Sequence, residues 1–380
     1  MNTNITYQRL GDYIREVNLR NRELRVTNLM GISMTKKFRP STSNVVGTDL
    51  SNYKIVSKNI FVFDTMSVIR VHKVPIAINN TDEPIIVSPA YHTFEVIDKN
   101  TLMPEYLMMW FCRPEFDRYA DFKSDSAIRG GYGWDELCDT IIDVPTIARQ
   151  REIVAEYETL GRRIRLNEKM IARLEETAQA IYRKMFVEGV DKENLPAGWI
   201  IGTLTDIATY LNGIACQKYE TTNAKYLPVL KIRELSQGFC DENSDHAEIT
   251  IPKDYIVEDG DVIFSWSATL FIDIWCGGKC ALNQHLFKVS SLKYPKWFYF
   301  LWTQNHIAEW KNLISAKATS MGHIKREDLE SAQVIIPSDS SLSEFDNQMR
   351  PVFDAYTIKK KENLKLTELQ SLLLARMGKE

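Results

Sequence analysis

Cysteine and histidine are the side chains of this chain best suited to hold a metal, and one short stretch spaces three of them. Cys276, Cys280 and His285 give the pattern C-x3-C-x4-H, which is close to that of a zinc knuckle. A structural zinc site needs four ligands, and Ser290 stands where the fourth would fall. We therefore expect a buried strand or turn with incidental thiols, and no metal site.

Sequence motifs for catalysis are also missing. The stretch GGKC at 277–280 lacks both the first glycine and the hydroxyl of a phosphate-binding loop. No glycine-rich cofactor turn follows a strand, and G-x-S-x-G, H-E-x-x-H and the D/N-P-P-Y/F tetrapeptide of amino-methyltransferases do not occur. An enzyme that acts alone is therefore disfavoured, and a methyltransferase or nuclease with an unfamiliar site stays open as an alternative.

Basic side chains are concentrated in two stretches of the chain. The net charge is −3 over 380 residues, which argues weakly against a protein that binds nucleic acid without partners. Residues 1–40 and 162–186 nevertheless carry more basic than acidic side chains. Either these stretches are solvated faces, or they contact DNA phosphates while a partner supplies the remaining contacts.

Two similar loops are the most promising places for a contact with DNA. They read KSDSAIRGGYGWDEL at 123–137 and SAKATSMGHIKREDL at 315–329, and a strand-like run follows each. Glycine in such a loop lets the backbone approach a surface closely. An ordinary exposed loop is the alternative reading.

The two loops belong to a sequence that is duplicated along the chain. The stretch LNQHLFKV at 282–289 matches PAYHTFEV at 89–96 and keeps a histidine, His92 against His285. Further matches follow in the same order: 203–208 with 9–14, 254–266 with 52–64, 325–337 with 133–145, and 348–356 with 150–157. The period is far above the roughly 20–50 residues of solenoid repeats, so we predict a tandem pair of domains.

Each half alternates strand-like and helix-like runs. The strand-like runs are NIFVFD, EPIIVS, TFEVID and TIIDVP, then YLPVLKI, DVIFSW, LFKVSS and AQVIIP, and helices are predicted at 104–120 and 295–314. We predict an α+β fold with two similar mixed α/β domains in tandem, each followed by a long helix. The domain boundaries are 1–148 and 189–340, the latter including a linker, and the helical regions are 149–188 and 341–380, with SDSSLSE at 338–344 as a second linker.

The long helices at 162–186 and 358–380 carry apolar residues at steps of three and four, which is typical of a coiled coil. The residues of this seam are Ile164, Ile171, Leu174, Ala178, Ile181, Met185, Leu366, Leu369, Leu373 and Met377. Packing of each helix on its own domain is the alternative, but the apolar stripes are narrow for a fully buried helix. We predict that the helices pair as an antiparallel coiled coil, as a pseudo-two-fold relation between the halves requires.

The length of the helices suggests a ruler. A helix of roughly 25 residues is about 38 Å long. This is close to one turn of B-DNA, about 34–36 Å. The helix pair would then set two reading heads about one DNA turn apart.

On these features the chain resembles the specificity subunit of a type I restriction-modification enzyme, and the resemblance covers essentially its whole length. It rests on the S/T-x-x-G…L…IP ending of each domain, on Gln150 and Gln348, on the helical stretches from Asn167 and Asn363, and on the closings AIYRKMF and LLLARM. Such regions often read P-x-x-E-Q-x-x-I after the strand. Here they read PTIARQREIV and PSDSSLSEFDNQMRPV, which leaves the local helix start open.

The resemblance implies a non-catalytic subunit whose two domains each read one half of a split target in double-stranded DNA. The helical pair would set the spacer and dock two modification subunits, which methylate adenine with S-adenosylmethionine. Restriction subunits that use ATP and Mg would join them in defence against phage, so no cofactor is expected on this chain. A two-headed protein-binding adaptor without DNA recognition is the alternative.

The location follows from what the sequence lacks. No run of 18 apolar residues and no apolar signal core occur, and six cysteines suit reduced thiols, so we expect a cytoplasmic protein without a membrane span.

Base contacts need side chains such as Arg, Lys and His. The candidates for contact with DNA are Lys36, Lys37, Arg39, Arg129, Tyr132, Lys231, Arg233, Lys317, His323, Lys325 and Arg326.

Overall fold

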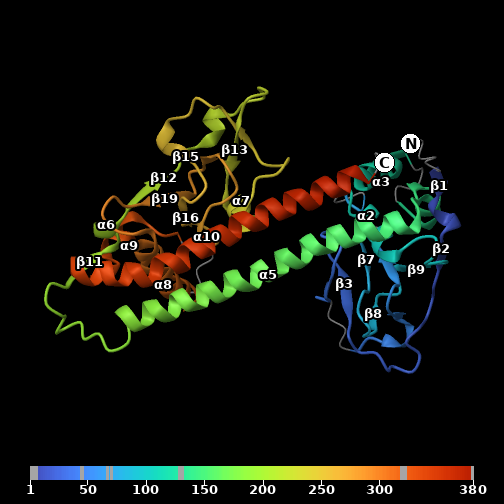
Figure 1. The fold of residues 1–380 in the computed structure, drawn as a ribbon, viewed down its shortest axis with the longest axis horizontal. Helices are drawn as coiled ribbons and strands as arrows, with labels where there is room; N and C mark the ends of the chain where they lie inside the picture. Colours follow the sequence, from blue (N-terminus) through green and yellow to red (C-terminus); the bar gives the residue numbers. More distant parts are fainter. Residues whose placement is uncertain are drawn as a thin grey trace. The chain divides into compact units, whose positions relative to one another are not determined.

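The computed structural model describes residues 7–42, 47–65, 68, 72–126, 132–316 and 323–377. The chain divides into two compact units, Met1–Arg162 with Thr367–Glu380, and Arg163–Leu366. Each unit contains one sheet-rich head and part of two long continuous helices, α5 (Ile147–Phe186) and α10 (Asp339–Arg376) (Figure 1). We call residues 7–143 the first head and residues 200–336 the second head.

The first head is built on a four-stranded antiparallel sheet with the order β2-β9-β6-β7. Its central strand β6 (Phe61–Phe63) is an unbroken apolar run because both faces of the sheet are covered. Phe61 and Phe63 pack into one core cluster, whereas Val62 packs into another on the opposite face. The remaining strands of this sheet are β2 (Ile14–Glu16), β7 (Ile76–Ile78) and β9 (His92–Val96).

Smaller elements complete the first head. They are β1 (Tyr7–Arg9), η1 (Leu10–Asp12), β3 (Met30–Ile32), β4 (Phe38–Pro40), η2 (Leu50–Asn52), β5 (Lys54–Val56), β8 (Ile85–Val87), α2 (Pro104–Phe111), α3 (Pro114–Ser126), α4 (Trp134–Cys138) and β10 (Ile141–Asp143). Strand β1 pairs with β10, so the first and last strands of the head lie side by side. The helix predicted over 104–120 is in fact two helices, because Pro114 starts a new one.

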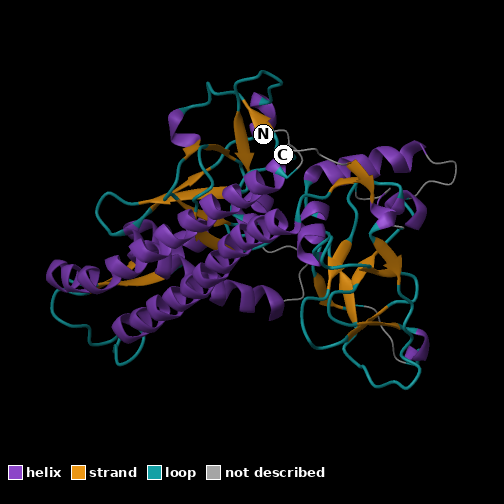
Figure 2. Ribbon diagram, turned by 45° about the vertical axis from the view of Figure 1, so that its right-hand side comes forward, coloured by secondary structure: helices purple, strands orange, loops and turns teal. Residues whose placement is uncertain are grey.

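The second head repeats this plan. Its antiparallel sheet has the order β12-β19-β16-β17, and β11 pairs with β20 as β1 does with β10. Strand β16 again divides its residues between two clusters, with Phe264 on one face and Ile263 on the other. The duplication predicted from the sequence is thus present in the topology of the two heads, whose strands are drawn in orange in Figure 2.

The second head also carries a sheet, β14-β13-β18-β15, in which β13 and β18 run parallel. The elements of this head are β11 (Ile200–Thr203), α6 (Leu204–Ile207), β12 (Thr209–Asn212), η3 (Cys216–Tyr219), β13 (Leu227–Leu230), α7 (Ile232–Gln237), β14 (His246–Ala247), η4 (Lys253–Tyr255), β15 (Ile256–Val257), β16 (Val262–Ser265), β17 (Phe271–Ile274), β18 (Cys280–Leu282), β19 (Leu286–Ser290), α8 (Lys296–Ala316), α9 (Arg326–Ser331) and β20 (Gln333–Ile336). The helix expected at 295–314 is α8.

Within each unit the segments of α5 and α10 pack together in opposite directions. In the unit of the second head, the Asn363 amide donates to the carbonyl oxygen of Ile164 at 3.5 Å. Further along α5, the Glu175 carboxylate is hydrogen-bonded to Tyr356, which comes earlier in α10 than Asn363. In the other unit, Gln370 Nε2 donates to the carbonyl oxygen of Tyr157 at 3.3 Å. The predicted antiparallel pairing is therefore present in both units.

The predicted seam is only partly correct, because the helices also pack on the heads. Ala178 and Met185 are buried in the core of the second head, and Met377 is buried in that of the first. Ile171, Leu174 and Ile181 pack partly against the second-head core, and Ile164, Leu366 and Leu373 are half-buried. Leu369 is 48% exposed and lines a hollow between the two helices.

Helix α10 also begins earlier than predicted, so the linker expected at 338–344 is wrong. Most of that stretch lies in the first turns of α10, where the backbone N–H of Ser341 donates to the hydroxyl of Ser338 at 3.3 Å. Leu342 and Met349 are buried against the second head and hold these turns in place. No helix in the described part of the chain is long and apolar enough to span a membrane.

Candidate nucleic-acid interface

A hollow of about 770 Å³ opens on the second head, where residues 323–329 lie beside the main sheet. Aromatic side chains form its walls, and basic side chains stand at its edge. The residues that line it are Thr205, Ala208, Thr209, Tyr210, Leu211, Asn212, Tyr255, Trp266, Phe287, His323, Ile324, Lys325, Arg326 and Leu329. An aromatic hollow with basic and amide groups is suited to the faces, edges and phosphates of nucleotides.

Trp266 is the centre of the aromatic wall. It follows strand β16, and its ring lies 5.9 Å from each of the rings of His285, Phe287 and His323. Its carbonyl oxygen accepts a hydrogen bond from the backbone N–H of Ile324 at 3.0 Å. That bond ties the residues in front of α9 to the end of β16, so the hollow is shaped by two segments far apart in sequence.

Strand β12 supplies the opposite side of the hollow. Tyr210 is half-buried, its hydroxyl is 2.6 Å from the hydroxyl of Thr303, and desolvation raises the pKa of the Tyr210 phenol. Asn212, at the end of the strand, is exposed and accepts a hydrogen bond from Trp266 Nε1 at 3.1 Å. Tyr210 thus supports the structure of the hollow, whereas Asn212 can reach a ligand.

Helix α9 positions the basic edge. The backbone N–H of Lys325 donates to Asp328 Oδ2 at 2.6 Å, which fixes the first turn of the helix. The Lys325 and Arg326 side chains extend from this turn, and Arg326 pairs with Glu330 at 3.0 Å with 86% of the arginine side chain exposed. An exposed pair of this kind contributes only about 0.3–0.5 kcal/mol, so the guanidinium can exchange it for a phosphate.

The structure therefore brings three of the predicted contact residues together, namely His323, Lys325 and Arg326. It does not bring Lys231 and Arg233 to them. The ammonium of Lys231 pairs with Asp245, and Arg233 binds Asp241 through two hydrogen bonds of 3.0 and 2.9 Å. Hydrogen bonds to Asp241 raise the pKa of Arg233, which indicates a structural ion pair around the loop after α7. Lys317 lies outside the described residues.

Two of the predicted contact residues in the first head are corrections. Tyr132 is fully buried, and its hydroxyl is 2.5 Å from that of Thr140, because its ring fills the core beside Phe63 and Phe116. Lys36 is 8% exposed and donates to the carbonyl oxygen of Phe111 and, at 2.8 Å, to Asp117.

The other candidates of the first head are accessible or undescribed. Lys37 and Arg39 are exposed, and Arg39 Nη1 donates to Thr42 Oγ1 at 3.4 Å. Arg129 lies outside the described residues. The first head therefore offers Lys37 and Arg39, but the structure does not join them into a cluster.

Sequence reasoning missed Trp266 and Asn212. The signal that pointed to them is the repeated histidine, because His285 lies against Trp266 and precedes strand β19. In the first head, His92 occupies the same place, and its ring stacks on Trp134 at 6.3 Å with an interplanar angle of 3°. The repeat shows that His92 and His285 hold matching positions, but it does not show which residues surround them.

The cysteine stretch has the expected buried character. Cys276 and Cys280 are buried, and burial raises the pKa of the Cys276 thiol to about 11. In the part of the chain that the structure describes, no three His, Cys, Asp or Glu side chains are gathered as a metal site.

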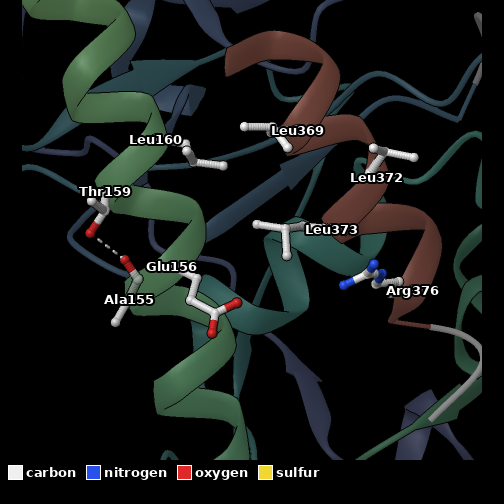
Figure 3. Close-up of a pocket in the computed structure, with 8 residues that line it drawn as sticks. All are labelled: Ala155, Glu156, Thr159, Leu160, Leu369, Leu372, Leu373 and Arg376. Atoms are coloured by element: carbon white, nitrogen blue, oxygen red, sulfur yellow. Dashed lines mark hydrogen bonds between the residues drawn. The ribbon is translucent and has the colours of Figure 1, made fainter. Parts of the chain in front are cut away.

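A second hollow, of about 550 Å³, lies between the segments of α5 and α10 that belong to the first unit. It is mostly apolar and is lined by Ala155, Glu156, Thr159 and Leu160 of α5 and by Leu369, Leu372, Leu373 and Arg376 of α10. In Figure 3 the leucines of the two helices face each other, with Glu156 and Arg376 beside them. Leu369 and Leu372 are 48% and 53% exposed, so this apolar surface is accessible.

The family match and the related protein both concern type I restriction enzymes. Residues 196–370 match the family described as "Type I restriction modification DNA specificity domain". The type I restriction enzyme MjaIX specificity subunit of Methanocaldococcus jannaschii is 23% identical over 304 residues, covering 74% of this chain and 70% of that protein.

Two solved structures align with nearly the whole chain. The S subunit of a type I restriction-modification system from M. genitalium aligns over 99% of this chain and 97% of its own, with a TM-score of 0.55 and 12% identity, and so shares its fold. The HsdS subunit from Thermoanaerobacter tengcongensis aligns over 99% and 97% of the chains with a TM-score of 0.38 and 16% identity.

The matched domain and the paired heads define a non-catalytic protein that recognises DNA sequence. Residues 196–370 thus carry a type I restriction-modification DNA specificity domain, and the chain is similar over 74% of its length to a specificity subunit of such a system.

Proposed function

We propose that each head reads one half of a split DNA target, and that partner subunits then methylate adenine or restrict the DNA. The observation that carries this proposal is the repetition of the same sheet in two heads, of which the second presents an aromatic hollow edged by Lys325 and Arg326. Two different heads suit an asymmetric target. In this proposal, Lys37 and Arg39 serve as contacts of the first head, with Arg129 and Lys317 as further candidates.

We also propose that residues 149–188 and 341–380 are spacer helices on which two modification subunits dock. The accessible apolar hollow between Leu160, Leu369 and Leu372 supports this, because an exposed apolar surface between helices is suited to an amphipathic helix of a partner. S-adenosylmethionine, ATP and Mg would be held by the modification and restriction subunits. The complex would work in the cytoplasm, where DNA is accessible.

The experiment that tests the reading role is an exchange of one head. Residues 200–336 are replaced by the second head of a relative, and methylated sites are mapped across the genome of cells that express the modification subunit. The expected result is a new second half-site with an unchanged first half-site and spacer. An unchanged DNA target combined with a changed set of bound proteins would favour the two-headed adaptor.

The spacer role has its own test. Deletion of Ala172–Ala178 removes seven residues, about 10 Å of helix, and keeps the apolar seam in phase. We expect a shorter spacer between two unchanged half-sites in the methylation map. Changed half-sites with the original spacer would contradict the proposal. If the seven-residue deletion abolishes all methylation, it is compared with a four-residue deletion, which shifts the apolar seam out of phase.

A further inference from the structure

The register of the two main sheets identifies one equivalent strand position that differs between the heads. In the second head, Asn212 of β12 lies opposite Phe287 of β19, two residues after His285. In the first head, Glu16 of β2 lies opposite Phe94 of β9, two residues after His92. The repeated histidine therefore aligns Glu16 with Asn212, both at the last residue of their strand.

The side chain next to this position also differs. Strand β6 pairs Phe61 with Phe94, and β16 pairs Phe264 with Phe287. Two residues further along, the first head has Phe63 and the second head has Trp266. The second head has thus gained an indole N–H at a place where the first head has only a phenyl ring.

That N–H fixes which way the amide of Asn212 points. The indole Nε1 of Trp266 is a donor only, so the atom of Asn212 that it meets at 3.1 Å must be the oxygen Oδ1. The amide nitrogen is then turned away from the indole. Within the described residues, Asn212 Nδ2 has no hydrogen-bond partner, and the side chain lines the hollow and is exposed.

Glu16 presents the opposite chemistry. Its Oε1 is 3.1 Å from His92 Nδ1, which orients the carboxylate, and 46% of the side chain is exposed. An ionised carboxylate can only accept hydrogen bonds, whereas an amide nitrogen can only donate them. At equivalent positions the first head therefore offers an acceptor, Glu16, and the second head offers a donor, the amide nitrogen of Asn212.

We propose that Asn212 and Glu16 are specificity-determining residues, each reading one base edge in the half-site of its own head. Asn212, oriented by Trp266, selects a base with an acceptor in the major groove, such as the N7 of a purine or the O6 of guanine. Glu16, oriented by His92, selects a base with an amino donor, such as the N4 amino group of cytosine. This inference rests on the proposed function, since it needs each head to read DNA.

The test uses the complete modification complex in cells, with a genome-wide map of methylated sites as the readout. Asn212→Asp converts the donor into an acceptor at nearly constant shape. We expect the preferred base at one position of the second half-site to lose about 5- to 150-fold in preference, with the first half-site unchanged. Asn223→Asp, at an exposed loop position of the same head, is the matched control and should leave the motif as it is.

Two further variants keep the test decisive if Asn212→Asp fails to fold. Trp266→Phe keeps an aromatic ring against Phe287 and removes the donor, so the amide can rotate and the same base pair should become degenerate. Glu16→Gln should relax one base pair of the first half-site and leave the second intact.

The possible failures are distinguishable. A wild-type chain that directs methylation to a split motif, together with Trp266→Phe and Glu16→Gln chains that direct it to the identical motif, overturns this inference and leaves the proposed function standing. Absence of any motif that depends on the wild-type chain overturns both.

Discussion

The two heads are joined to the long helices by different chemistry, although the heads share a topology. In the first unit, Gln150 of α5 is fully buried, and its amide donates to the carbonyl oxygens of Thr101 and Pro145 at 2.8 Å while accepting from the backbone N–H of Met103 at 2.8 Å. In the second unit, the repeated glutamine, Gln348, is exposed, and the neighbouring Met349 is buried in its place.

In the second unit, charged groups connect the head to helix α10. Asp273 of β17 accepts from the hydroxyl of Tyr356 at 3.0 Å and from the ammonium of Lys360 at 2.5 Å. Lys360 also donates to the carbonyl oxygen of Ile274 at 3.0 Å. The two heads thus share the same sheet but differ in how they attach to the helices. A neutral amide makes the attachment in the first unit, and an ionic cluster makes it in the second.

The largest effect should come from the neutral junction. Gln150→Ala leaves two carbonyl oxygens and one N–H, all in partly buried hydrogen bonds, without their partner, and we expect a loss of about 2–5 kcal/mol in the free energy of unfolding. The matched substitution Gln348→Ala should cost less than about 0.5 kcal/mol, because that side chain is exposed. Urea unfolding followed by tryptophan fluorescence measures both. Equal losses would show that the two glutamines still play the same part.

A smaller effect is expected at the ionic junction. Asp273→Asn removes the charge that binds Lys360, whose side chain is only 18% exposed, and should cost about 1.5–3 kcal/mol. Tyr356→Phe deletes one hydrogen bond from the same cluster and should cost about 1 kcal/mol. The same unfolding measurement applies. A larger loss for Tyr356→Phe than for Asp273→Asn would mean that packing and not charge holds this junction.

The smallest effects concern pH, and two carboxylates of the second unit should respond in opposite directions. Burial raises the pKa of Glu175, so the folded state holds its proton more tightly than the unfolded state. Its ionisation therefore costs stability as pH rises above the ordinary carboxyl pKa of 4.5, and Glu175→Gln should stabilise the protein at neutral pH.

Glu362 has the reverse dependence. Hydrogen bonds from Arg163 and Lys359 lower its pKa to about 2, so its contribution is present above pH 4.5 and is lost as pH falls toward 2. Because the Arg163 side chain is 54% exposed, we expect Glu362→Gln to cost only about 0.5 kcal/mol at neutral pH. Unfolding curves at pH 3, 5 and 7 test both variants, and the same sign of change for the two at pH 7 would contradict this assignment.

The sequence predicted the features that depend on local patterns. Unbroken apolar runs such as NIFVFD became central strands, and the ordered repeats became matching sheets. The start of α10 was not predicted because its first turns are polar. Only the burial of Leu342 and Met349 against the second head explains why these turns are helical.

The candidate site was less accessible to sequence reasoning because its parts are distant in the chain. Trp266 and Asn212 are 54 residues apart, and nothing in either segment indicates that they meet. Tyr132 lies in a glycine-rich stretch, which predicts an exposed loop residue, yet its ring packs in the aromatic core of the first head. Lys36 looked like a basic surface residue, but its ammonium has partners in the buried region around Asp117.

The central claim is that this chain directs a DNA-modifying complex to one split sequence. The most direct measurement is a genome-wide map of adenine methylation in cells with the chain and in cells that lack it, both expressing the modification subunit. Methylation at one split motif should disappear when the chain is absent and return when the chain is supplied again. An identical methylation pattern in both cell types would contradict it.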